Sequence, residues 1–314
     1  MNEDDKRISH GWIFSLLILG IILFLLINVT TVIEAMREAL KMCAHSIIPS
    51  LFPFMLLSDI LVSRGDVYFF ADILGKPLEK IFKISRYGAI ALVLGVICGF
   101  PIGGKLACSL SEDGFISEEE CARLASIANC ASPAFVIGTV GVVFLSDYKI
   151  GIILYVSQLL SVLLFSLFTK RSPSGRGIAL SIKNKKKKSL TDSVKDSAIS
   201  ALFLSSFIIS FALISRLVAK TIPNLFITNI ITAFLEIGSS AKSASILFHI
   251  SPISAILILS FSISFSGLSV YMQTKSYFDS LRIKMRGYIV AKFVQGVISV
   301  LITFFLIKIY LSTF

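Results

Sequence analysis

The sequence predicts an all-α, polytopic helical membrane protein with two inverted repeats, each with a re-entrant hairpin and a broken helix. Of its 314 residues, 55% are hydrophobic and 16% are charged, whereas soluble domains carry about 25% charged residues. The apolar residues form blocks of roughly 18–22, the length that a helix needs to span the hydrocarbon core. Similar interruptions of these blocks occur in the same order in each half of the chain. The alternating pattern of an outer-membrane barrel is absent from the sequence.

The chain divides into four parts. Residues 1–29 are expected to form an N-terminal transmembrane helix, because 12–29 is almost continuously apolar. The flanking charges are mixed and no A-x-A cleavage site follows, which argues against a removed signal peptide. Residues 30–168 form the first repeat and residues 191–314 the second. Between them, 169–190 is a basic linker, and its lysines place it on the cytoplasmic side of the membrane.

The first repeat begins with an amphipathic segment at 30–45, which is expected at the membrane interface. An apolar segment at 46–62 follows, and its prolines predict a kinked helix. Apolar residues at helical spacing in 70–84 indicate an interfacial helix. The repeat closes with an uninterrupted span at 150–168.

Two interruptions lie between these elements. The segment 87–110 is apolar on both sides of a glycine-rich break at 99–104, and each arm is too short to span the bilayer. This pattern predicts a re-entrant hairpin. The helix after it opens at Ser117 and Glu120, which have the spacing of a capping box, and it breaks at 129–133.

The second repeat follows the same order. Acidic and basic residues at 192–196 precede a long apolar segment at 198–218, an interfacial piece, and a Gly/Ser break at 236–242. A second break at 264–267 and a final span complete it. Basic residues place both the linker and 271–288 in the cytoplasm. The repeats then enter the membrane from opposite sides, as in many secondary transporters.

Lys105 and Lys242 end the two glycine- or serine-rich breaks. Broken helices leave backbone groups unpaired at membrane depth, where they are tolerated if they line a cavity or are buried in protein. A carrier for a polar solute has a use for such breaks. Two lysines and two half-helix N-termini together favour a small organic anion. The alternative is that each lysine extends to the interface and keeps its ammonium in water.

The candidate substrate-binding residues all lie at or beside the breaks. Glu236 is the carboxylate in the second re-entrant segment; it either couples transport to a proton or sodium ion, or pairs with one of the two lysines. The complete candidate set is Gly99, Gly103, Gly104, Lys105, Asn129, Ser132, Glu236, Ser239, Ser240, Lys242, Ser266 and Gln273.

Several other classes of protein fit the sequence poorly. The net charge of +11 comes mainly from lysines in short loops beside apolar segments, so nucleic acid is not the expected partner. The five cysteines form no CxxC pair and are expected to be small buried residues. The three histidines are widely separated, and no nucleophile and base lie at a meaningful spacing. We therefore expect no enzyme, bound metal or other cofactor, and the bilayer and a small anionic solute as partners.

The segment 98–105, Cys-Gly-Phe-Pro-Ile-Gly-Gly-Lys, resembles the signature of the sporulation integral membrane protein family called YlbJ or SpoVV. Segments 116–124, 129–141 and 265–273 resemble further motifs of that family, whereas 236–239 departs from its pattern. The resemblance implies two gate-type repeats, distantly related to concentrative nucleoside transporters. It also implies the movement of dipicolinic acid across a forespore membrane during endospore formation. A nucleoside transporter, and a structural component that assembles with itself or with other sporulation membrane proteins, are the alternatives.

Overall fold

The computed structural model describes residues 3–63, 67–169 and 189–312, and every regular element in these ranges is a helix. The protein is therefore all-α, as predicted. Most of the basic linker lies outside the described residues. Within them, five helical segments are long and apolar enough to cross a membrane: Val29–Leu61, Tyr148–Phe168, Leu190–Thr221, Pro252–Ser280 and Tyr288–Ser312. The chain is a multi-pass membrane protein.

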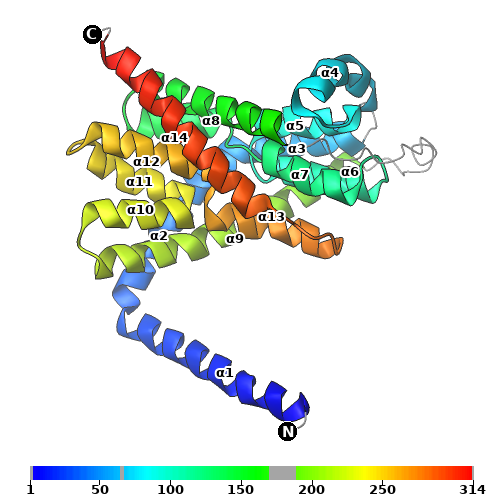
Figure 1. Cartoon of the computed structure of the whole chain (residues 1–314). Helices are drawn as coiled ribbons and strands as arrows, with labels where there is room; N and C mark the ends of the chain where they lie inside the picture. Colours follow the sequence, from blue (N-terminus) through cyan, green and yellow to red (C-terminus); the bar gives the residue numbers. More distant parts are fainter. Residues whose placement is uncertain (1–2, 64–66, 170–188, 313–314) are drawn as a thin grey trace.

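The helix α1 (Glu3–Ile27) stands apart from the body formed by the other helices (Figure 1). It is helical, as expected, and carries exposed apolar side chains from Trp12 to Ile27. Its apolar part, Ser15–Ile27, is shorter than the roughly 20 residues of a typical span. That α1 crosses the membrane therefore remains a prediction.

The two halves of the body follow one order of elements. The first contains α2 (Val29–Met42), the π-helical turn η1 (Cys43–Ile47), α3 (Ile48–Ser63), α4 (Val67–Phe82), α5 (Arg86–Cys98), α6 (Ile102–Glu112), α7 (Glu118–Ala128), the π-helix η2 (Ala134–Phe144) and α8 (Tyr148–Phe168). The second contains α9 (Leu190–Thr221), α10 (Leu225–Leu235), α11 (Ile237–Phe248), α12 (Pro252–Phe265), α13 (Gly267–Ser280) and α14 (Tyr288–Ser312).

Each half consists of a long first helix, a hairpin, a broken helix and a closing span. The hairpins are α5–α6 and α10–α11, and the broken helices are α7–η2 and α12–α13. Corresponding helices of the two halves pack on each other: α2 and α3 against α9, and α8 against α14. The internal repeat itself, and the inverted orientation of the repeats in the membrane, remain predictions.

The elements differ from the expected ones at two places. The segment at 30–45 is not a separate element, because α2 continues through η1 into α3 as one 33-residue candidate span; its position at the membrane interface stays a prediction. Packing against α9 accompanies the burial of Ala35 and Ala39 in α2. The second half also lacks the expected interfacial piece, since three residues, 222–224, separate α9 from α10. In the first half a separate helix does lie where the interfacial helix was expected: the Gly75–Phe82 part of α4 is bent by 88° from α5. Its position at the interface stays a prediction.

The tip of each hairpin packs closely against the broken helix of its own half. A Cβ added to Gly103 would lie 2.2 Å from the carbonyl oxygen of Ala128, so only glycine permits this approach. In the second half, a Cβ on Gly267 would lie 3.0 Å from the carbonyl oxygen of Leu235, and Gly267 itself has a φ of 74°. Hairpin tips and helix breaks therefore meet in both halves.

All five cysteines are buried and free, as the sequence predicted. The expected capping box at the start of α7 forms in part. The Ser117 hydroxyl accepts a hydrogen bond from the Glu120 backbone, but the Glu120 carboxylate turns away and accepts one from the backbone N–H of Ser85, at 2.5 Å. Glu120 thereby joins the start of α7 to the start of α5.

Candidate functional site

Four helix breaks surround one internal cavity. They are the hairpin tip between α5 and α6, the break between α7 and η2, the residue Glu236 between α10 and α11, and Ser266 between α12 and α13. Residues at or near each break line the cavity, and α9 and the segment from η1 to α3 complete its wall. The lining residues are Ile47, Leu51, Phe100, Ser132, Phe135, Leu204, Ile208, Glu236, Ile237, Ser269, Val270 and Gln273.

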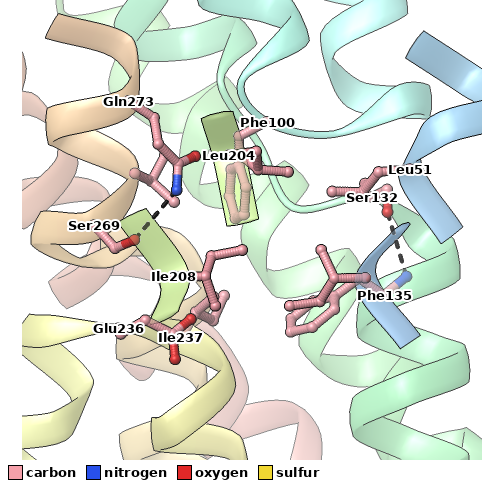
Figure 2. Close-up of a pocket in the computed structure, with 12 residues that line it drawn as sticks. Leu51, Phe100, Ser132, Phe135, Leu204, Ile208, Glu236, Ile237, Ser269 and Gln273 are labelled. Carbon is pink, nitrogen blue, oxygen red and sulfur yellow. Dashed lines mark hydrogen bonds between the residues drawn. The ribbon is translucent and has the colours of Figure 1, made fainter. Parts of the chain in front are cut away.

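The lining combines aromatic and aliphatic walls with a few polar groups, which is the usual composition of a small-molecule site. Figure 2 shows Gln273 and Ser269 on one side of the space, and Ser132 and Phe135 on the other. The cavity has a volume of about 30 Å³, which holds two or three water molecules at about 10–15 Å³ each. A larger solute therefore needs a movement of the surrounding helices.

Glu236 is buried and forms the N-terminal cap of α11. Its carboxylate accepts hydrogen bonds from the backbone N–H groups of Gly238 at 2.7 Å and Ser239 at 2.5 Å. A negative charge at this position is stabilised by the helix dipole. Glu236 does not pair with Lys242, which the sequence left open, because the Lys242 ammonium pairs with Glu38 instead.

Neither of the two candidate lysines lines the cavity. The Lys242 ammonium lies 2.7 Å from the Glu38 carboxylate of α2, and both side chains are about half exposed. The Lys105 ammonium donates a hydrogen bond to the Ser200 hydroxyl of α9, at 3.3 Å. The structure thus brings Ser132, Glu236 and Gln273 together at the cavity, but it does not bring the lysines there.

The remaining candidate residues support the breaks. Gly99, with a φ of 87°, packs against Ser132, and Gly104 packs against Thr274. Asn129 is buried, and its amide donates hydrogen bonds to the Thr274 hydroxyl at 2.7 Å and the Tyr288 hydroxyl at 2.8 Å. These contacts join the break in the first half to α13 and α14 of the second.

The hydroxyls near the second-half break are poorly satisfied. Ser240, Ser264 and Ser266 are buried, and their hydroxyl oxygens have no hydrogen-bond partner among the described residues. The side-chain oxygen of Gln273 is also unpaired, whereas its amide nitrogen donates to the Ser269 hydroxyl at 3.2 Å. Buried polar atoms are usually paired, so the unpaired oxygen of Gln273, which lines the cavity, is suited to a polar solute or water.

Several residues that the structure places at the site are not among the candidates predicted from the sequence. Phe100 and Phe135 stand directly beside breaks, and an aromatic residue at a break is a usable signal for a cavity wall. Gln158 and Lys292 hold the first-half break from α8 and α14. An ionisable residue inside an apolar span is a functional candidate by default, and Lys292 met that criterion in the sequence.

Fold and site together define a multi-pass helical membrane protein with two helical hairpins and two broken helices around an internal cavity. The chain is 28% identical over 309 residues to the sporulation integral membrane protein YlbJ of Bacillus subtilis (strain 168), an alignment that covers 84% of this chain and 74% of that protein. The similarity extends over most of both proteins and agrees with the resemblance of segment 98–105 to that family. No family model and no solved structure matches the chain.

Proposed function

We propose that this protein is a membrane carrier for a small organic anion, with dipicolinic acid in endospore formation as the solute that the family resemblance implies. The observation that carries the proposal is the convergence of four helix breaks on one cavity. In secondary transporters, discontinuous helices form the substrate site near the membrane midplane, and the ends of the half-helices face substrate and ions.

The helix ends at the cavity support an anion as the solute. The N-terminus of α11 is already capped by the Glu236 carboxylate, and that of η2 by the Ser132 hydroxyl. The N-termini of α6 and α13 carry no side-chain cap. Each is flanked by cavity-lining residues, Phe100 at α6 and Ser269 at α13. A solute with two carboxylates complements two such ends, because helix N-termini stabilise negative charge.

A nucleoside is the second candidate solute, and a specific observation favours it. The polar groups that line the cavity are the Gln273 amide, the Glu236 carboxylate and the hydroxyls of Ser132 and Ser269, and neither candidate lysine is among them. A neutral solute with donors and acceptors fits such a lining. The rings of Phe100 and Phe135 suit a planar ring of either kind of solute.

Uptake into vesicles containing the purified full-length protein tests the proposal. Dipicolinate is expected to accumulate, and Gln273→Leu is expected to slow its uptake by about two- to thirteenfold, the effect of losing one hydrogen bond of about 0.5–1.5 kcal/mol. Met272→Leu is the matched control, because the neighbouring Met272 is exposed and lies outside the cavity lining. Uptake of uridine but not of dipicolinate would show that the solute is a nucleoside and not an organic anion. If the folded protein takes up neither solute, the proposal that it is a carrier is wrong.

A further inference from the structure

Lys292 is a buried lysine in α14, with 1% of its surface exposed. Its ammonium donates hydrogen bonds to the backbone carbonyl of Asn129 at 3.0 Å and to the side-chain oxygen of Gln295 at 3.1 Å. In the part of the chain that the structure describes, no carboxylate forms an ion pair with it. A charged group is costly to bury unless its surroundings compensate it. Other groups must therefore stabilise the Lys292 ammonium in place of a carboxylate.

The compensation comes from the end of α7. Asn129 is the C-terminal cap of that helix, and the last carbonyl groups of a helix have no partner within it. The helix dipole also places partial negative charge there. Gln295, one turn after Lys292 in α14, donates its amide to a second of these carbonyls, that of Ser126, at 3.1 Å. Lys292 and Gln295 therefore both donate to carbonyl groups at the C-terminal end of α7, and the Lys292 ammonium is the cation bound there.

The C-terminal end of α7 lies next to the proposed solute site. The break that begins at Asn129 also contributes Ser132 to the cavity. In many secondary transporters, carbonyl groups at the C-terminal ends of half-helices coordinate the coupling sodium ion or proton. Here the Lys292 ammonium is bound to one of those carbonyls, that of the C-terminal cap Asn129. The side-chain oxygen of Asn129 is also buried and has no partner among the described residues.

We propose that the Lys292 ammonium takes the place of a coupling sodium ion at the end of α7, so that the protein holds its first-half break in the binding geometry without sodium. Lys292 is then a positioning residue, which acts on the solute through the Asn129–Ser132 break. The effect on transport rests on the proposed function, whereas the occupation of the cation position is testable without any solute.

Thermal unfolding of the purified full-length protein provides that test. The wild type is expected to have the same Tm in sodium, potassium and choline chloride at equal ionic strength. Lys292→Ala is expected to have a lower Tm in choline, and sodium or ethylammonium chloride should recover most of the loss by filling the vacated position. Lys308→Ala is the matched control, because Lys308 is an exposed lysine of the same helix. It should show no response that distinguishes sodium or ethylammonium from choline.

A wild-type Tm that rises in sodium relative to choline would overturn the proposal, because the protein would then hold a sodium site of its own. A Lys292→Ala variant that is as stable as the wild type, or that no cation restores, would also overturn it. If that variant does not fold, the wild-type comparison decides, and a Lys292→Arg variant that folds supports the need for a cation.

Uptake measurements separate this inference from the carrier itself. Vesicles with the wild type should accumulate solute equally with sodium or choline outside, whereas Lys292→Ala should require sodium. If wild-type uptake requires sodium, the inference fails and the carrier stands. If no solute is taken up, the carrier fails, and the Tm comparison still judges the cation position.

Discussion

The two broken helices differ in how firmly their breaks are held. In the first half, Gln158 of α8 accepts a hydrogen bond from the Ala131 backbone N–H and donates one to the Ala131 carbonyl, both at 3.0 Å. Lys292 and the Asn129 side chain add contacts to α13 and α14. In the second half, Ser266 has a left-handed backbone, and its hydroxyl is unpaired among the described residues.

This difference assigns unequal roles to the two halves of the site. The first-half break is a fixed wall, because separate side chains satisfy its backbone. The second-half break has buried hydroxyls that gain hydrogen bonds if the local structure changes or a solute enters. The cavity of about 30 Å³ is too small for an organic solute, so binding of the proposed solute requires one wall to move. We expect the α10–α13 side to move, because its buried hydroxyls are not held by partners among the described residues.

The largest expected effect is on the fixed wall. Gln158→Leu leaves the N–H and carbonyl of Ala131 buried and unpaired, at a cost of about 1–3 kcal/mol for each group. The Tm of the purified protein should therefore fall clearly. The Tm of Gln158→Glu should fall as well, because its carboxylate keeps one acceptor but places a second oxygen against the Ala131 carbonyl in a buried site. A Gln158→Leu variant as stable as the wild type would show that the first break is not held in this way.

A smaller effect is expected on the exposed side of the second hairpin. Lys242→Gln removes the ion pair with Glu38, and an exposed pair of this kind contributes about 0.2–1 kcal/mol. Stability and uptake should both change little. A strong loss of uptake at unchanged Tm would place Lys242 at the anion site, as the sequence predicted, and would give the α11 helix a direct role in binding.

The smallest effect is expected at an unpaired hydroxyl. Ser264→Ala removes a buried group without a partner in the described residues, and alanine is the better helix former by up to about 0.7 kcal/mol. Its Tm should stay the same or rise slightly. Ser260→Ala in the same helix is the matched control. It loses hydrogen bonds with Ser299 at 2.8 Å and Thr303 at 2.7 Å, so its Tm should fall. An equal fall in both variants would contradict a loosely held second break.

The sequence located the breaks well and their partners poorly. Gly99, Asn129, Glu236 and Ser266 stand in polar or glycine-rich interruptions of apolar sequence, which local composition reveals. The positions of the lysines could not be read in this way, because a lysine side chain is long and its direction depends on neighbouring helices. Lys242 meets Glu38, which lies 204 residues away in the chain.

The same limit applies to the fixed wall. Gln158 and Lys292 bind the break at 129–133 from helices that follow it by 27 and 163 residues. No spacing rule within one helix predicts a contact of this range. The continuity of α2 and α3 was missed for a different reason: the charged residues of 30–45 suggested an interfacial segment, whereas η1 joins it to the span.

The burial of all five cysteines makes the protein convenient for site-specific probes. A thiol reagent added to the folded wild type meets no exposed native thiol, because all five are buried. A single cysteine introduced at an exposed position, such as Val143 at the end of η2 or Ile250 after α11, would then carry a spectroscopic label alone. Two such labels report the separation of the two halves in solution, and so record directly whether the cavity opens when a solute is added.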